Sequence, residues 1–155
     1  MEKRELFRSF TKRVKAEKRS ITPPYLNGSL SLCVDCEAPC IGECETDILF
    51  KDTEALIAID FTQQGCTYCE ACADICDKDV LSLGGENVYI KHSVYIDETA
   101  CVAHHNVMCM SCKEPCIDNA INFDGLFKPI IDPTACTSCG FCLSRCPTSA
   151  IKVLI

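Results

Sequence analysis

The chain has 155 residues, of which 16 are cysteine, and it carries a formal net charge of −7. It contains no tryptophan, and only 7% of its residues are aromatic. Small domains with so few large apolar side chains bury too little surface to fold without disulfides, metal or another cross-link. The composition therefore excludes a fold held together by an ordinary apolar core alone.

The charge is divided unevenly along the chain. Residues 1–20 have eight lysines and arginines against three glutamates, a formal charge of +5, which leaves −12 for the remaining 135 residues. A protein that binds nucleic acid presents a basic surface on its folded body. Because this body is acidic, we expect no nucleic-acid partner.

The N-terminal segment has the pattern of an amphipathic helix. Four apolar side chains recur there at helical intervals between basic residues, namely Leu6, Phe7, Phe10 and Val14. Such a helix fits a groove of a partner protein or an anionic membrane surface, but without a lipid anchor a short helix binds membranes weakly. We expect residues 1–30 to form a basic segment, helical or disordered, in which residues 1–20 contact a partner protein rather than a membrane surface. A solvated helix without a partner is the alternative.

The redox state of the cellular compartment determines whether the cysteines form disulfides or remain free thiols. Small cysteine-rich domains are usually secreted and stapled by disulfides, and secretion needs an apolar segment after a charged start. The stretch 21–32 is interrupted by Pro23, Pro24, Asn27 and Gly28. No apolar run approaches the roughly 18 residues that cross a bilayer. We therefore expect a cytoplasmic protein whose thiols stay reduced and free to bind metal.

The cysteines fall into four groups of four along the chain. Groups two and four share the spacing C-x2-C-x2-C-x3-C, group one has three residues in its second interval, and group three has seven residues in its first. The groups are Cys33, Cys36, Cys40 and Cys44; Cys66, Cys69, Cys72 and Cys76; Cys101, Cys109, Cys112 and Cys116; and Cys136, Cys139, Cys142 and Cys146.

These spacings are typical of bacterial 4Fe–4S ferredoxins, in which three thiolates from one loop bind one cluster and the fourth cysteine reaches the neighbouring cluster. Structural zinc sites usually take two cysteine pairs separated by a dozen or more residues. Three thiols within seven residues fit a cubane better than a zinc ion or a disulfide. Gly140 removes a side chain where the backbone must pass close to the cluster. The spacing therefore predicts four 4Fe–4S clusters.

Strand and helix signals surround the cysteine groups. The apolar segments 56–61 and 128–132 precede groups two and four and are predicted as strands. The stretches 76–81, 116–121 and 146–151 each predict a short helix that is opened by the last cysteine of its group, followed by a strand. This repeat predicts an α+β fold of tandem dicluster ferredoxin-like modules.

The linker lengths favour pairing of consecutive groups. Groups one and two are 21 residues apart and groups three and four are 19 apart, against 24 between groups two and three. We expect one module at residues 31–83, a linker at 84–94 and a second module at 95–155. A nested pairing, group one with four and two with three, is the alternative. The crossed ligand sets would be Cys33, Cys36, Cys40 and Cys76 (set one); Cys66, Cys69, Cys72 and Cys44 (set two); Cys101, Cys109, Cys112 and Cys146 (set three); and Cys136, Cys139, Cys142 and Cys116 (set four).

Complete ligation points to electron transfer rather than catalysis. Each group supplies four thiolates, so no iron keeps an open position to bind and activate a substrate. The sequence also has no Rossmann or phosphate-loop glycine pattern and no His-Glu-x-x-His motif. His104 and His105 lie in the long interval of group three, where we favour an exposed loop over an imidazole that couples protonation to cluster charge or replaces a thiolate. We expect an electron carrier or assembly factor without a catalytic site of its own.

A basic start leads into the Pro-Pro-aromatic element Thr22–Tyr25, and seven residues separate Cys101 from Cys109 in group three. With these features beside its four cysteine groups, the sequence resembles the NapF-type ferredoxins, which are associated with periplasmic nitrate reductase systems and whose third motif has a similar gap. Two features depart from the pattern: group one has three residues, 37–39, where two are common, and proline follows only Cys146 among the four final cysteines.

The resemblance implies a cytoplasmic protein that contacts the molybdenum-containing catalytic subunit of the nitrate reductase before its export. Its role there would be to pass electrons to that subunit or to help assemble its iron–sulfur centre. Two alternatives stay open: an electron-transfer subunit of another cytoplasmic oxidoreductase, and a chaperone-like factor that recognises its partner through residues 1–25.

Overall fold

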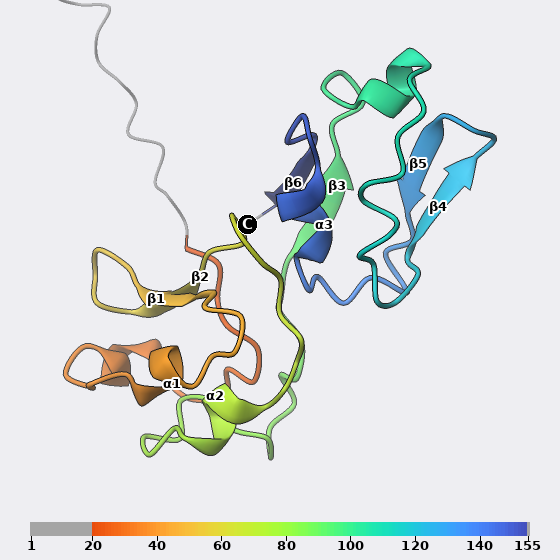
Figure 1. Cartoon of the computed structure of the whole chain (residues 1–155). Coiled ribbons are helices and arrows are strands. Elements are labelled where there is room, and N and C mark those ends of the chain that lie inside the picture. Colours follow the sequence, from red (N-terminus) through yellow and green to blue (C-terminus); the bar gives the residue numbers. More distant parts are fainter. Residues whose placement is uncertain (1–19, 155) are drawn as a thin grey trace, which may run out of the picture.

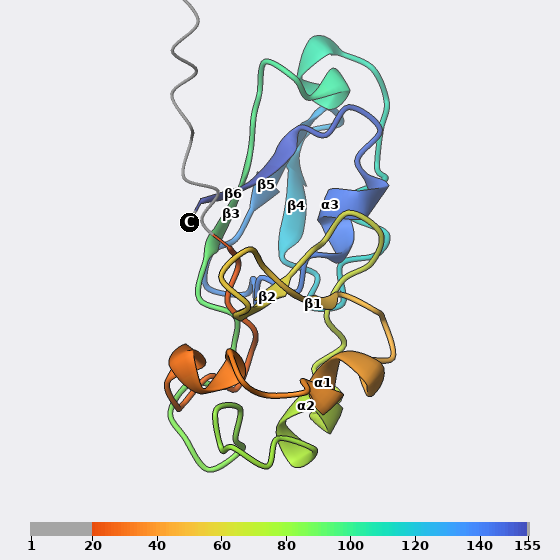
Figure 2. The same ribbon diagram turned by 90° about the vertical axis from the view of Figure 1, so that its left-hand side faces the viewer.

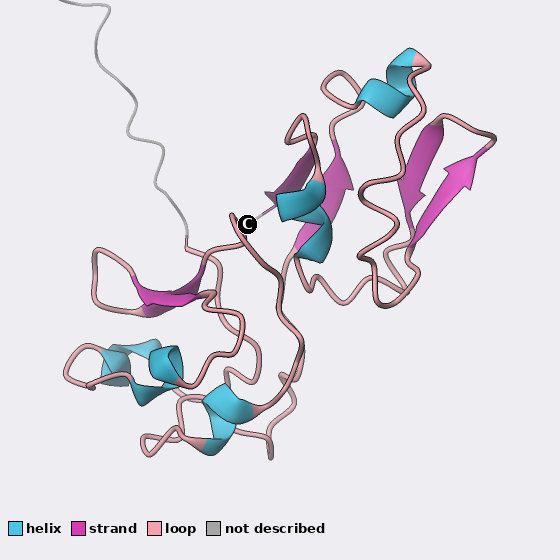
Figure 3. Ribbon diagram, viewed as in Figure 1, coloured by secondary structure: helices cyan, strands magenta, loops and turns pink. Residues whose placement is uncertain are grey.

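A computed structural model describes residues 20–154 and consists of short helices and three two-stranded antiparallel sheets (Figure 1). Residues 1–19 and Ile155 lie outside the described residues, and with them the predicted amphipathic helix. Loops and turns make up most of the remaining path (Figure 3). No helix among residues 20–154 is long and apolar enough to cross a membrane.

The N-terminal half, residues 20–92, is built around one hairpin. Its strands pair with Leu49 opposite Ile59, and two short helices pack below them, where Figure 2 shows both helices on the same side of the hairpin. The elements are the 3-10 helix η1 (Leu30–Cys33), α1 (Pro39–Gly42), β1 (Leu49–Lys51), β2 (Ile57–Ile59) and α2 (Ala71–Asp74).

The C-terminal half, residues 93–154, contains two ribbons that contact each other through β3 and β5. The last strand of the chain pairs with the first strand of this half, with Ile151 opposite Ile96, so the ends of the half are joined. The elements are β3 (Ser93–Ile96), the 3-10 helix η2 (Val102–His105), β4 (Ile121–Asp124), β5 (Lys128–Ile131), α3 (Phe141–Arg145) and β6 (Ile151–Leu154).

The strands lie where the sequence predicts them, but the helices do not. β2 and β5 lie within the two apolar segments predicted as strands, and β4 and β6 follow groups three and four as expected. The prediction that the fourth cysteine opens a helix is wrong. Helices α1, α2 and α3 all come before the fourth cysteine of their groups, and the corresponding stretch of group three, residues 111–115, forms turns.

A left-handed turn after each fourth cysteine explains the difference. The third residue beyond that cysteine has a φ of +49° to +53° in all four groups, and its N–H donates to the cysteine carbonyl oxygen over 3.0–3.2 Å. A right-handed helix cannot continue through such a residue. Aspartate and asparagine tolerate this conformation better than most side chains. The four residues are Asp47, Asp79, Asn119 and Ser149.

The first folded unit begins earlier than predicted. Ile21 and Leu26 form β-bridges with Ile59 and Leu81, and Tyr25 between them is only 3% exposed. Residues 20–30 are therefore part of the N-terminal half rather than of a separate basic segment. The predicted linker 84–94 also differs from the structure, because β3 already begins at Ser93.

Cysteines form a large share of the core. The buried cluster of the N-terminal half includes Cys33, Cys40, Cys66 and Cys72 beside aliphatic side chains such as Leu81. The C-terminal half has two small clusters that likewise contain cysteines. Because thiols stand where aliphatic side chains would otherwise pack, the stability of this core depends on what the thiols bind.

Candidate iron–sulfur cluster sites

One small cavity in the N-terminal half is lined by the four cysteines predicted as set one. Cys33 comes from the end of η1, Cys36 from the loop after it, Cys40 from α1, and Cys76 from the turn after α2. Ile57, Val80 and other apolar side chains complete the wall. The crossed arrangement thus brings three thiols of group one beside the last thiol of group two.

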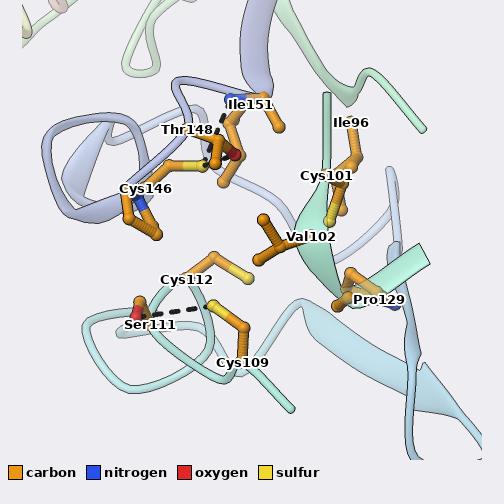
Figure 4. A pocket seen from close by; sticks show the side chains of 13 residues that line it. Ile96, Cys101, Val102, Cys109, Ser111, Cys112, Pro129, Cys146, Thr148 and Ile151 are labelled. Carbon is orange, nitrogen blue, oxygen red and sulfur yellow. Dashed lines mark hydrogen bonds between the residues drawn. The ribbon is translucent and has the colours of Figure 1, made fainter. Parts of the chain in front are cut away.

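A second small cavity, in the C-terminal half, has the same arrangement of cysteines (Figure 4). Cys101, Cys109 and Cys112 line it together with Cys146, which follows α3. The close-up shows the four side chains arranged around a common space. Neither cavity combines the cysteines that the nested pairing would require.

The thiols predicted as sets two and four are also close to one another. Burial, followed by the nearby thiolates of Cys66, Cys40, Cys69 and Cys44, raises the pKa of Cys72 to about 12. Burial, followed by the nearby thiolates of Cys139, Cys136, Cys116 and Cys112, likewise raises the pKa of Cys142 to about 12. The structure therefore brings Cys44 to the loop of group two and Cys116 to the loop of group four.

Buried neutral thiols of this kind fit a cationic iron–sulfur core. Burial raises the pKa of Cys40, Cys66 and Cys112 to about 11, so these thiols hold their protons at neutral pH. Metal binding displaces such protons, and the bound iron then offsets the repulsion between neighbouring thiolates. Among residues 20–154, no three His, Cys, Asp or Glu side chains form a group that could hold a single metal ion.

Backbone N–H groups point at several of the sulfurs. Hydrogen bonds to sulfur stabilise the thiolate over the thiol, and around a bound cluster they tune its electron affinity. Cys146 illustrates the effect, because burial raises its pKa but the amides of Ala150 and Thr148 outweigh burial and lower it. The donors, at 3.2–3.4 Å, are Ala38 to Cys36, Tyr68 to Cys66, Leu81 to Cys76, Ala120 to Cys116, and Ala150 to Cys146.

The loops of groups two and four share a backbone conformation. Tyr68 and Glu70 have φ values of +56° and +69°, and the equivalent Ser138 and Gly140 have +61° and +84°. A side chain at Gly140 would also meet an obstacle, because its Cβ would lie 2.3 Å from the ring of Phe61. Gly140 is thus required by its backbone angle and by close packing.

The seven-residue interval of group three forms the 3-10 helix η2. His105 Nε2 lies 3.0 Å from the carbonyl oxygen of Thr99, and His104 Nδ1 lies 3.9 Å from the Glu98 carboxylate. Both imidazoles therefore face the turn before Cys101, and neither is among the residues that line the cavity of Figure 4. This geometry favours a structural role for the insertion over a histidine ligand.

Tyr25 has a role that no pattern in the sequence indicated. Its hydroxyl donates to the carbonyl oxygen of Tyr68 over 3.0 Å, and the two rings meet edge to face with centroids 6.4 Å apart. Burial, followed by the charges of Glu70 and nearby cysteines, raises the pKa of Tyr25 to about 12, so the hydroxyl remains a donor. The Pro-Pro-aromatic element therefore supports the loop that carries Cys66 and Cys69.

Comparison with known proteins agrees with this geometry. The 4Fe-4S binding domain family matches residues 129–152, which contain group four. The ferredoxin-type protein NapF of Escherichia coli (strain K12) is 30% identical over 148 residues, covering 91% of this chain and 88% of that protein. NapF of Haemophilus influenzae is 32% identical over 140 residues, covering 86% and 78%. The ferredoxin-type protein NapG of Escherichia coli (strain K12) is 28% identical over 158 residues, covering 83% and 66%.

The family match and the cysteine sets lead to the same kind of protein. A 4Fe-4S binding domain lies at the C-terminal end of a chain that has cysteine-lined cavities in both halves. The similarity to NapF proteins extends over most of both sequences. The chain belongs to the NapF family of ferredoxin-type proteins and is an iron–sulfur protein.

Proposed function

We propose that this protein carries single electrons through four 4Fe–4S clusters and has no catalytic site of its own. The observation that carries the proposal is the pair of cavities, each lined by three thiols of one group and the last thiol of the next. Sets one to four, as defined from the sequence, would hold the clusters. Each bound cluster accepts and returns one electron.

The surroundings of the thiols suit a low reduction potential. A fully thiolate-ligated cluster is anionic, and residues 21–155 already carry a formal charge of −12. Negative charge near a cluster disfavours the additional electron, whereas N–H donors to sulfur favour it. The protein therefore sets the potential of each set through its local count of acidic residues and amide donors.

The proposed partner is the molybdenum-containing catalytic subunit of a periplasmic nitrate reductase, met in the cytoplasm before export. The similarity to NapF proteins supports this choice, since the resemblance to that family implies an association with periplasmic nitrate reductase systems. The protein would pass electrons to the subunit or help assemble its iron–sulfur centre. Residues 1–20, with a formal charge of +5, would contribute to its recognition.

The first experiment is chemical analysis of the full chain purified without oxygen. We expect iron and acid-labile sulfide in the amounts of four 4Fe–4S clusters per chain, and reversible bleaching on reduction. A colourless protein, or one zinc ion per cysteine group, would refute the electron-carrier proposal.

A second experiment tests the partner. The holoprotein is immobilised and offered the purified catalytic subunit, and a chain without residues 1–20 serves as the comparison. We expect capture by the full chain and weaker capture by the truncated chain at equal cluster content. Equal capture by both chains would remove the role of residues 1–20, and no capture by either would favour another oxidoreductase as partner.

A further inference from the structure

The loops of groups two and four touch each other directly, although about 70 residues separate them in the chain. The N–H of Cys66 donates to the carbonyl oxygen of Cys139 over 2.6 Å. The hydroxyl of Tyr68 donates to the carbonyl oxygen of Thr137 over 2.5 Å. Each loop therefore binds the other through a residue that is itself a proposed ligand or its close neighbour.

Glycine makes this approach sterically feasible. A Cβ atom at Gly65 would lie 2.5 Å from the backbone nitrogen of Phe141 and 2.7 Å from the carbonyl oxygen of Cys139. On the other loop, Gly140 packs against the ring of Phe61, which belongs to the N-terminal half. Two glycines, one from each half, thus allow the two cysteine loops to meet backbone to backbone.

The other two groups lie away from this contact. Figures 1 and 2 show η1 and η2, which adjoin the first cysteines of groups one and three, at opposite ends of the molecule. Within each half the crossed ligands join the sites, because Cys40 and Cys72 share one buried cluster and Cys112 packs with Cys142 in another. The spatial order of the sites is therefore not their order along the chain.

We propose that electrons cross between the two halves from set two to set four, so that the four clusters form a line in the order one, two, four, three. This inference rests on the proposed function, because it presupposes that all four sets are filled. Each transfer moves one electron from a reduced cluster to an oxidised neighbour, and no bond forms or breaks. Sets one and three, at the two ends, exchange electrons with external one-electron donor and acceptor proteins.

The test compares distances between clusters that are made paramagnetic in pairs. Removing one thiolate favours loss of one iron, and the resulting three-iron cluster has an unpaired spin when oxidised, unlike an intact oxidised 4Fe–4S cluster. The thiols to remove are exposed or half-buried, so their truncation to alanine leaves little cavity. They are Cys36 in group one, Cys69 in group two, Cys109 in group three and Cys136 in group four.

Three double variants of the full chain are prepared without oxygen and oxidised, and the spin–spin coupling is measured by pulsed electron paramagnetic resonance. C69A/C136A reports sets two and four, C69A/C109A reports sets two and three, and C36A/C136A reports sets one and four. We expect the strongest coupling in C69A/C136A. Coupling as strong in C69A/C109A would overturn the proposed order in favour of the order along the chain.

A cross-linking experiment on the otherwise native holoprotein covers the case in which a double variant loses its clusters. A benzophenone amino acid replaces the exposed Gln64, next to Gly65, or the exposed Lys78 as the control. We expect Gln64 to cross-link to residues 137–143 and Lys78 not to. Absence of that product in protein with full iron content would overturn the inference, whereas absence of iron would refute the proposed function instead.

Discussion

Individual cysteine thiols in this protein differ in how readily they lose their protons. Burial and neighbouring thiolates raise the pKa of the partly buried Cys142 to about 12, whereas hydrogen bonds lower the pKa of Cys146 below the ordinary value. Thr148 contributes to the second effect, since its hydroxyl lies 3.8 Å from the Cys146 sulfur. Burial and hydrogen bonding at each cysteine therefore determine how well each ligand set stabilises negative charge.

Replacing Thr148 with valine tests this control of charge. Thr148→Val keeps the shape but removes the hydroxyl, so we expect the reduction potential of one cluster to fall. A hydrogen bond contributes about 0.5–1.5 kcal/mol, which corresponds to roughly 20–60 mV for a one-electron couple. A potentiometric titration followed by electron paramagnetic resonance measures the change. Thr53→Val, in the exposed β1–β2 turn, is the control and leaves all four potentials unaltered.

Tyr25 provides a second test at the level of single atoms. Tyr25→Phe keeps the buried ring but leaves the carbonyl oxygen of Tyr68 without its donor. An unsatisfied buried acceptor costs roughly 1–3 kcal/mol. We therefore expect the holoprotein to lose its visible cluster absorbance at a lower temperature than the wild type. Tyr95→Phe, at a half-exposed position on β3, should cause no such decrease.

The helices of this protein are too short to be stable alone, and the turns beside them fix the positions of the cysteine ligands. The helices α1, α2 and α3 have four or five residues each, and isolated helices of this length do not persist in water. Left-handed residues before and after them set the direction of the chain, as at Gly140 before α3 and Ser149 after Cys146. A change in one of these turns therefore displaces a ligand rather than merely a loop.

Gly140→Ala tests the importance of such a turn. The added methyl group meets the Phe61 ring and must adopt a φ of +84°, so we expect a loss of roughly 1–3 kcal/mol. The measurement is the temperature at which cluster absorbance disappears. Gly84→Ala is the matched control, because a Cβ atom there meets nothing within 4 Å. Equal midpoints for the two variants would contradict this account.

At the scale of the whole molecule, cofactor binding and folding are one process. Every buried cluster contains cysteines, and without iron no bond joins the sulfurs of the separate loops to one another. The remaining apolar side chains form only small clusters in the C-terminal half. The protein without iron should therefore have no compact state of comparable stability.

Iron removal tests this coupling directly. Under anaerobic conditions an iron chelator should abolish both the visible absorbance and most of the far-ultraviolet circular dichroism. The same chelator already saturated with iron is the control and should leave both signals intact. A circular dichroism spectrum that survives complete iron loss would show that the apolar side chains suffice.

Local sequence patterns were enough for some of this architecture but not for all of it. The cysteine spacing indicated the grouping of thiols, and apolar runs located β2 and β5, because both are signals within a few residues. The helices were misplaced because the left-handed positions in these stretches are occupied by Asp79, Asn119 and Ser149, and no glycine marks them in the sequence. The contact between Gly65 and Phe141 joins distant segments, and no local pattern reports it.

Because the ligand sets are crossed, the two halves acquire their last ligand cysteines at different times during synthesis. All eight cysteines proposed for sets one and two have been incorporated once residue 76 is added to the growing chain. The N-terminal half therefore has all of its proposed ligands early in synthesis. Set three is complete only when Cys146 has been added. The strand β6, which pairs with β3 in the same half, ends at Leu154. Cofactor insertion can therefore begin at the N-terminal half while translation continues, whereas the C-terminal half is complete only after Cys146 and β6 have been synthesised.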